Sequence, residues 1–334
     1  MPPFTIRPTE AGESLRVREF LAGIFGTGID APSLRLDLIR WKYYDARPDW
    51  AGSRSYVLER GGEYAAHGCV WPMRLFGVDA CQIIDWAGAP KAAGAGLLLR
   101  REIEKRVTVS VGIGGSEDSR KVMPRAGYKT VAAFRTFVRV LRPFRQFGRR
   151  TEPTLLLRAA KTARAWLWSL PLLPRTPAGW SVDAVTRFRD EDLDTGAVRS
   201  PELLNYLMAC PAVRMHGYVL RKNGQIAGQL LLADVDSQAR IADLQLTAGE
   251  REDWAAAVGL ATRLAAQNGA SEVVAHSSFE PFSDALRAAA YRERGSEPVF
   301  VKGAWGDGAM PPLHITPADY DDFFAIRPGQ PFAT

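Results

Sequence analysis

The sequence has few of the residues that build metal centres or covalent cross-links. Its 334 residues include only three cysteines and four histidines. Cys69, Cys81 and Cys210 are widely separated and form no CxxC pair, so the sequence suggests neither a zinc site nor a disulfide framework. Each cysteine has apolar neighbours, which predicts that all three thiols fill the core. We therefore expect no metal to take part in the function.

Long apolar runs without charge are also missing. No stretch approaches the ~20 residues that a membrane-spanning helix needs, and the N-terminal residues lack the apolar core of a signal peptide. Apolar residues make up 46% and charged residues 24% of the chain, values that are ordinary for a soluble globular protein. We expect a cytoplasmic protein with enough residues for two ordinary domains or one large one.

Acidic residues are almost absent from one segment. From Arg135 to Arg164 there are nine Lys or Arg residues and one acid, Glu152, which gives this segment a net charge of +8. The whole chain has a net charge of +6, so the remaining residues together carry −2. Because the basicity is local, the sequence predicts no nucleic-acid surface that extends over the protein.

The same region has the composition of a linker, which we place at 148–178. Residues 154–170 have helical spacing, and the basic residues Arg158, Lys161 and Arg164 lie three apart, so they form a stripe. Leucine and tryptophan supply apolar surface, and three prolines close the segment. Two interpretations stay open: a helix packed between two domains, or a helix in peripheral contact with an anionic membrane.

The same order of sequence features occurs twice in the chain. "SYVLERGGEYAAHGCVWPMRL" and "GYVLRKNGQIAGQLLLADV" each read as a strand, a polar glycine turn and a second strand. Three landmarks recur in the same order at shifts of 158 to 163 residues: Tyr56 and Tyr218, Asp85 and Asp243, Tyr128 and Tyr291. Recurrence of this kind predicts a duplicated domain.

Hydrophobic spacing predicts a similar order of elements in each half. In the first half we expect helices at 10–24, 32–44, 94–106 and 116–126, and strands at 54–60, 64–76, 80–88, 107–112 and 128–140. In the second half we expect helices at 200–208, 250–268 and 280–289, and strands at 216–222, 225–235, 239–246, 271–276 and 291–302. Hairpins followed by strand–helix–strand units predict an α/β (α+β) fold, with a mixed, mostly antiparallel sheet flanked by helices in each half. We place the two domains at 1–147 and 179–334.

One loop joins a strand to a helix through two glycines, in "IIDWAGAPKAAGAGLLLRREIEK". Backbone N–H groups at the start of a helix attract anions, and glycine lets a phosphate approach the backbone. The pattern Lys91-x-x-Gly94-x-Gly96 is not a P-loop, because no Gly-Lys-Ser/Thr follows, and Leu99 takes the place of the third glycine of a dinucleotide fingerprint. A tight turn with small residues for packing stays open as the alternative.

With its surrounding elements, this loop resembles the acetyl-CoA loop of the GNAT superfamily of acyl-CoA N-acyltransferases, Arg/Gln-x-x-Gly-x-Gly/Ala, with Lys91 as the first residue. Asp85 and Pro90 resemble the Asp and Pro of the preceding strand, and Ser119–Tyr128 resembles the small-residue helix that ends in Gly-Phe. "RWKYYDARPDW" is similar to the opening of one bacterial branch. The resemblance covers about 40–140. The second half has no glycine loop and looks like a degenerate copy.

The resemblance implies acetyl-CoA or another acyl-CoA as co-substrate. Its pyrophosphate would rest on the backbone N–H groups of the loop, and its pantetheine arm would run along the strand before the loop. The cofactor-binding residues implied are Trp86, Ala87, Gly88, Lys91, Ala92, Ala93, Gly94, Ala95 and Gly96. An amine would attack the thioester directly, with a backbone N–H stabilising the oxyanion.

The general base that this reaction needs is less well defined. Asp85 lies on the cofactor strand, Glu117 lies near the end of the next strand, and His67 lies on a neighbouring strand. Each has a structural alternative: a structural Asp for Asp85, a helix cap for Glu117, and a satisfied structural histidine for His67. Met123 stands where many family members have a tyrosine acid, so no donor for the leaving thiolate is evident.

We expect an N-acyltransferase whose acceptor is a small amine or a cell-envelope precursor, with no nucleic-acid partner. A peptidoglycan-bridge type aminoacyl transferase and a non-catalytic module that binds CoA or a partner protein are the alternatives. We expect the tail after Gly303 to pack on the body as an ordered arm or to close a cleft.

Overall fold

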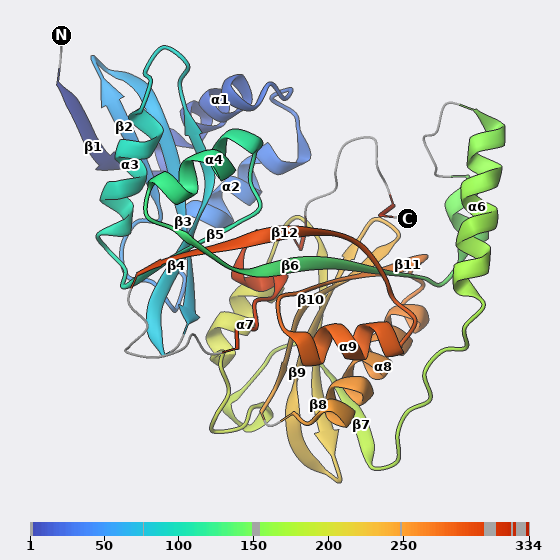
Figure 1. Ribbon diagram of the computed structural model, residues 1–334. Helices are drawn as coiled ribbons and strands as arrows, with labels where there is room; N and C mark the ends of the chain where they lie inside the picture. The colour runs from blue at the N-terminus through green and yellow to red at the C-terminus, as the bar shows by residue number, and fades with distance from the viewer. Residues whose placement is uncertain are drawn as a thin grey trace.

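The computed structural model describes residues 3–75, 77–148, 154–247, 249–303, 312–321, 323–324 and 332–333. Their strands form one sheet in the order β1-β2-β3-β4-β5-β12-β6-β11-β10-β9-β8-β7 (Figure 1). The first-half strands are β1 (Phe4–Pro8), β2 (Ser55–Arg60), β3 (Glu63–Leu75), β4 (Val78–Gly88), β5 (Val109–Ile113) and β6 (Lys129–Val140). The second-half strands are β7 (Trp180–Val185), β8 (Arg214–Lys222), β9 (Gln225–Val235), β10 (Gln238–Leu246), β11 (Glu272–Ser277) and β12 (Arg292–Gly303). The predicted mixed, mostly antiparallel sheet is confirmed.

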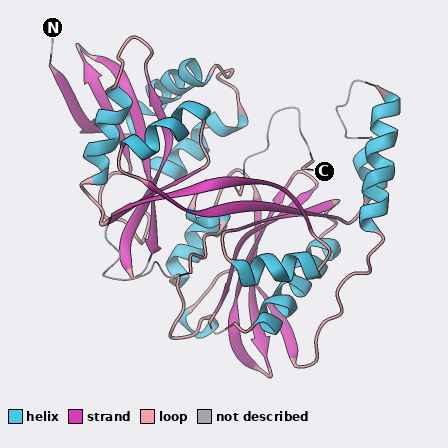
Figure 2. Cartoon of the chain, in the orientation of Figure 1, coloured by secondary structure: helices cyan, strands magenta, loops and turns pink. Residues whose placement is uncertain are grey.

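Helices flank this sheet (Figure 2). They are α1 (Ser14–Phe25), α2 (Leu36–Tyr43), α3 (Ala95–Glu104), α4 (Glu117–Arg125), α5 (Pro143–Phe147), α6 (Leu155–Ser169), α7 (Pro201–Met208), α8 (Arg251–Gln267) and α9 (Glu280–Ala288). Ser116, Thr154 and Ser200 each accept a hydrogen bond from the N–H three residues later, so side-chain caps set where α4, α6 and α7 begin. In the part of the chain that the structure describes, no helix is long and apolar enough to cross a bilayer.

The two halves repeat one arrangement. The order β2-β3-β4-α3-β5-α4-β6 recurs as β8-β9-β10-α8-β11-α9-β12. Even an irregularity recurs, because the β3/β4 register shifts between His67 and Cys69 and the β10/β9 register shifts between Ile241 and Asp243. A bulge bends its strand and re-aims side chains, so the bulges place Asp85 and Asp243 alike. The predicted duplication is confirmed.

The halves exchange their last strands. β12 lies between β5 and β6 and is antiparallel to both, with Val299 opposite Ile113 on one side and Ala132 on the other. β6 in turn pairs with β11, where Ala275 lies opposite Phe137. Each half therefore supplies a strand that completes the sheet of the other.

Helices cover both faces of the sheet in the first half. Val57 and Cys69 pack into a core cluster with α1 and α2, while their neighbours Leu58 and Val70 pack on the other face with α3. The first cluster extends into the second half through α7 and the buried Phe323 of the C-terminal arm. One hydrophobic core therefore joins the halves. All three cysteines are buried in these cores, as the sequence predicts.

Three elements are not among the sequence predictions. β1 and β7 are short strands at the two outer edges of the sheet, paired antiparallel with β2 and β8. Their residues are mostly exposed or half-exposed, so they lack the clean alternation that marks a half-buried strand. α5 has only five residues and begins at Pro143.

The strand exchange predicts that neither half folds alone. When the chain is divided into 1–150 and 151–334, the first polypeptide should have unpaired strand edges at β5 and β6, and the second at β11. Each should stay unfolded or aggregate. Mixed during refolding, they should form a 1:1 complex. Circular dichroism and size-exclusion chromatography would check this. A first polypeptide that unfolds cooperatively as a monomer on its own would contradict the prediction.

Candidate functional site

An opening in the sheet lies between β4 and β5. The two parallel strands pair from Ala80 and Val109 to Gln82 and Val111 and then separate. In the part of the chain that the structure describes, no strand pairs with β4 on this side beyond Gln82. The edge of residues 83–88 therefore offers its backbone to this opening.

The glycine loop lies at the end of that edge and starts α3. Gly94 has a left-handed φ of +83°, and a Cβ built there would meet no atom within 4 Å. Position 96 is a glycine for a different reason. A Cβ there would lie 3.2 Å from Trp86 Nε1, which donates a 2.8 Å hydrogen bond to the Gly96 carbonyl. The turn at Gly94 is thus open to solvent, whereas Gly96 is required for packing.

Several loop N–H groups have no backbone acceptor. Ala92 donates to the Ala89 carbonyl and Ala95 donates to the Ala92 carbonyl. Within the described residues, the N–H groups of Ala93, Gly94 and Gly96 donate to no backbone carbonyl. Lys91, Ala93 and Gly94 are exposed. These N–H groups, at the positive end of the α3 dipole, can bind an anion.

A buried polar cluster holds α3 against β5. Arg100 Nη2 donates a 2.7 Å hydrogen bond to the Tyr128 hydroxyl, which also contacts Ser110 at 2.7 Å and Glu104. Lys302 of the exchanged strand pairs with Glu104 at 2.7 Å. Burial raises the pKa of Tyr128, so the phenol stays protonated. The cluster fixes the start of α3 relative to the opening.

The half-buried Asp85 forms an ion pair with the buried Lys42 on the α2 side of the sheet. Its Oδ2 accepts hydrogen bonds from Lys42 Nζ at 2.5 Å and from the Tyr43 hydroxyl at 2.6 Å. Its φ is +46°, within the β4 bulge. Burial would raise the pKa of Asp85, but the Lys42 ammonium and the two hydrogen bonds hold it below its usual value. The carboxylate is therefore ionised and already paired.

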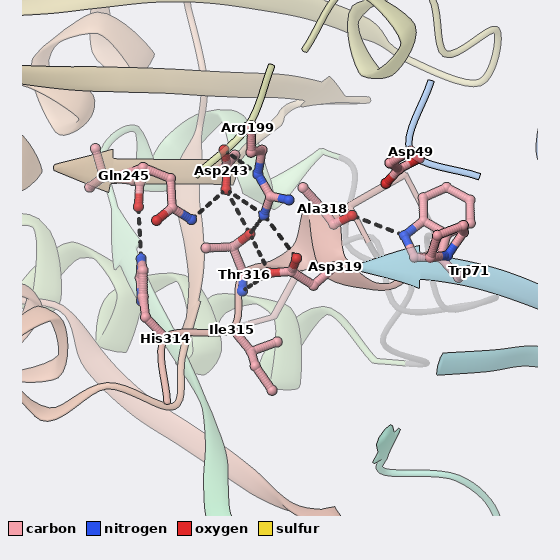
Figure 3. A network of polar contacts seen from close by, with 12 residues as sticks. Asp49, Trp71, Arg199, Asp243, Gln245, His314, Ile315, Thr316, Ala318 and Asp319 are labelled. Atoms are coloured by element: carbon pink, nitrogen blue, oxygen red, sulfur yellow. Dashed lines mark hydrogen bonds and ion pairs between the residues drawn. The ribbon is translucent and has the colours of Figure 1, made fainter. Parts of the chain in front are cut away.

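The second half contains the counterpart of this pair. Arg199 Nε donates a 2.8 Å hydrogen bond to Asp243, and its Nη2 reaches Asp319 at 3.0 Å (Figure 3). Thr316 adds a 2.8 Å hydrogen bond to Asp243. Since Asp85 and Asp243 occupy equivalent bulges and both pair with a buried cation, this arrangement does not depend on the glycine loop.

His67 is fully buried beneath the bulge. Its Nδ1 lies 3.0 Å from the Asp85 carbonyl oxygen and its Nε2 lies 3.1 Å from Ser55 Oγ. Thr9 donates to Ser55, so the Ser55 hydroxyl donates to Nε2 and the Nδ1–H donates to Asp85. Burial lowers the pKa of His67 to about 4. The neutral ring holds the bulge backbone in place.

The third sequence candidate, Glu117, lies at the start of α4. Its side chain is 81% exposed and pairs with Lys121 at 2.7 Å. The structure thus brings Asp85 and His67 together on β3 and β4, whereas Glu117 lies apart on α4. Met123 is buried, and a Cβ on Gly112 would collide with its Cε atom, so it packs against the end of β5.

Two further carboxylates near the first half come from distant sequence. Asp321 of the C-terminal arm lies 3.4 Å from Lys42 Nζ. Glu297 of β12 lies at the end of β5, where a Cβ on Gly114 would collide with its carboxylate. Neither acid has a sequence signal, because strand exchange and arm packing bring them to these places.

The corresponding opening in the second half is filled by the chain itself. β10 and β11 pair only as far as Arg240 and Val274. Beyond that point, His314 Nε2 lies 2.8 Å from the Leu244 carbonyl oxygen of β10. Ser278, just after β11, donates to the Leu313 carbonyl at 2.7 Å. The C-terminal arm therefore occupies the space between the separated strands.

The helix starts around the two openings also differ. In the second half Trp254, Phe279 and Phe282 surround the His314 ring at centroid distances of 5.1 to 5.8 Å. In the first half, the start of α3 carries small residues, and the exposed Glu117 lies at the start of α4. Among the described residues, the first opening therefore borders an exposed helix start, whereas the second is packed with aromatic rings.

Comparison with solved structures identifies the fold. A tandem GNAT protein from the clavulanic acid biosynthesis pathway is 13% identical with a TM-score of 0.54, over 92% of this chain and 100% of that one. A GCN5-related N-acetyltransferase from Anabaena variabilis is 14% identical with a TM-score of 0.56, over 90% and 72%. Saccharomyces cerevisiae N-myristoyltransferase with bound myristoyl-CoA is 12% identical with a TM-score of 0.56, over 96% and 84%. This chain has the tandem GNAT fold. No family model matches it, and neither does any curated protein.

Removing the cation beside Asp85 should destabilise the protein. Lys42→Met leaves a largely buried carboxylate without its cation, and we expect the free energy of unfolding to fall by about 3–5 kcal/mol. Lys42→Met with Asp85→Asn removes both charges and should recover most of this loss. Lys121→Met, which breaks the exposed pair with Glu117, serves as the control and should cost under about 1 kcal/mol. Urea unfolding measures all four proteins; equal effects of Lys42→Met and Lys121→Met would refute a buried pair.

The buried His67 should make stability depend on pH. Because its folded pKa of about 4 lies below the ordinary 6.5, the unfolded chain takes up the proton first as the pH falls. The free energy of unfolding should therefore decrease between pH 6.5 and pH 4, by up to about 3 kcal/mol. His67→Gln should flatten this dependence in urea titrations across that range. Parallel pH profiles for the parent and the variant would disprove it.

Proposed function

We propose that the first half binds acyl-CoA in the opening between β4 and β5 and transfers the acyl group to an amine. One observation carries the proposal: this opening is bordered by the exposed turn at Gly94, while its equivalent in the second half is filled by residues 313–315. The solved structures that share the fold support it, since they include N-acetyltransferases and an enzyme with bound myristoyl-CoA.

The loop would hold the diphosphate of the cofactor. Of the residues Lys91, Ala92, Ala93, Gly94, Ala95 and Gly96, we assign the main contacts to the amides of Ala93 and Gly94, because those of Ala92 and Ala95 already have acceptors. Lys91 is exposed beside them and adds a charge-assisted contact. The α3 dipole favours the same negative charge.

The pantetheine arm would extend along the free edge of β4. Backbone groups at Trp86, Ala87 and Gly88 would pair with its amides, as a neighbouring strand would. The thioester would then lie near the bulge at Asp85, where backbone N–H groups are turned out of the regular ladder. One of these would stabilise the oxyanion of the tetrahedral intermediate.

The amine nitrogen would bond to the thioester carbon, and the carbon–sulfur bond would then break. Among the three acid–base candidates, we assign proton acceptance through water to Glu117, whose carboxylate reaches solvent. Asp85 and His67 would be positioning residues, because both are engaged within the fold. The thiolate would leave as such or take a proton from water, since Met123 offers none.

The acceptor is proposed as a small amine, with an amine of a cell-envelope precursor as the first class to try. A panel of amino sugars, diamines and amino acids, assayed by release of free CoA thiol, would identify it. Binding of CoA without thiol release from any amine would favour a non-catalytic CoA-binding module. Transfer that requires aminoacyl-tRNA would favour the aminoacyl transferase alternative.

Placing a carboxylate in the loop should weaken cofactor binding. Gly94→Glu would set a negative charge where the diphosphate rests, and we expect the Kd for CoA to rise at least about tenfold. Gly224→Glu is a matched control, because Gly224 also has a positive φ, of +79°, with no atom within 4 Å of its Cβ position. It should leave the Kd unchanged.

Isothermal titration calorimetry measures both variants and the stoichiometry. The parent protein should bind one CoA per chain, because the second opening is occupied. A Gly94→Glu variant that binds CoA as tightly as the parent would overturn the proposed site, and two molecules bound per chain would overturn the assignment of a single site.

A further inference from the structure

Exposed apolar side chains are concentrated in one segment between the halves. Seventeen large apolar side chains are exposed among the described residues, and ten of them lie between Phe144 and Leu173. Single exposed leucines are ordinary, but a dense group marks an interaction surface. We call the exposed residues of α5, α6 and 170–173 the linker face.

α6 presents its apolar side to solvent. Every exposed residue within α6 is Leu, Ala or Trp, whereas Arg158, Lys161 and Arg164 are half-buried and Thr162 is buried. Apart from Leu157, the exposed positions cover about 140° of the helix surface, at roughly 100° per residue. A helix on the surface of a water-soluble domain normally has the opposite orientation.

Contacts with the body hold α6 in this orientation. Thr162 and Ala165 are buried on its inner side, and α6 packs against α5 and β6. Just beyond its end, Arg139 Nη2 donates hydrogen bonds to the carbonyls of Pro171, at 3.0 Å, and Leu172, at 2.9 Å. Figure 1 shows α6 at the edge of the molecule, beyond the end of β11. The apolar side is therefore accessible to a large partner.

Charge indicates what that partner is. From Arg142 to Arg175 the sequence has eight Lys or Arg residues and one acid, Glu152. A second copy of the chain on the same face would bring two strongly positive segments together, which is unfavourable. An anionic surface is attracted by this charge, and a flat apolar strip of Leu, Ala and Trp suits the boundary between lipid headgroups and acyl chains.

We propose that the linker face docks on the surface of an anionic lipid bilayer, with α6 parallel to the membrane. Its leucines enter the acyl region and Trp166 lies at headgroup depth, while the positive charge of the segment is attracted to lipid phosphates. The proposal does not depend on acyl transfer, because it uses none of the residues of the β4/β5 opening.

Vesicle sedimentation of the full chain tests it. The parent protein should sediment with phosphatidylcholine vesicles that contain phosphatidylglycerol, and much less with phosphatidylcholine alone. Leu156→Glu with Leu167→Glu, at side chains 82% and 56% exposed, should weaken binding at least about tenfold. Leu15→Glu with Val198→Glu is the matched control, because these side chains are 55% and 59% exposed, lie outside the linker face and change the charge equally. It should change binding less than about twofold.

Each other outcome overturns the proposal. Failure of the parent to bind phosphatidylglycerol vesicles, or an equal loss in the control variant, would show that the linker face is not a membrane site. A parent that is a dimer by analytical ultracentrifugation, with a monomeric Leu156→Glu, Leu167→Glu variant, would assign the face to a second copy. Thermal melts of both double variants within a few degrees of the parent confirm that folding is intact.

Discussion

The position of β12 between β5 and β6 is the constraint on which the rest of the structure depends. β5 pairs with β4 over only three residues on one side and with β12 over five on the other. The exchanged strand therefore holds β5 while β4 bends away at its bulge. The opening between β4 and β5 exists in the first half because a strand from the second half supports its far wall.

Each half contains an ion pair between an aspartate and a buried cation. Lys42 pairs with Asp85, and Arg199 pairs with Asp243. The C-terminal arm connects them, because Asp319 contacts Arg199 and Asp321 contacts Lys42. The arm thus gives each buried cation a second carboxylate partner and joins the halves through charge as well as through the common core.

The duplicated halves differ where a ligand would bind. The first opening has Gly94, small residues and free backbone groups, and the second has aromatic side chains around His314. Burial lowers the pKa of His314, so it enters this apolar space as a neutral ring. The same strands therefore separate beside an exposed turn in one half and around packed side chains of the arm in the other. Both halves remain necessary, since each completes the sheet of the other.

Most secondary structure follows from local pattern. The hairpins around Tyr56 and Tyr218, the helix after Gly94 and the repeat of Asp85 as Asp243 all appear in the spacing of apolar and turn residues, because such spacing reflects one strand face or one helix side. The sequence did not predict β1 and β7, because these edge strands bury few side chains and so lack a clear alternation of apolar and polar residues. The sequence also could not predict the orientation of α6. The spacing of apolar and basic residues shows that the helix has two different sides, but it does not show which side packs against the protein.

The sequence by itself therefore determined the elements, their duplication and the loss of the glycine loop from the second half. Tertiary structure alone decided that β12 crosses into the first half, that Asp321 lies beside Lys42 and Glu297 at the end of β5, and that residues 313–315 fill the second opening. The physical reason is the range of the interactions. Backbone hydrogen bonds within a helix or a hairpin join near neighbours. The pairing of β12 with β5 and the contact of Lys42 with Asp321 join residues more than 150 positions apart, whose partners no local pattern specifies.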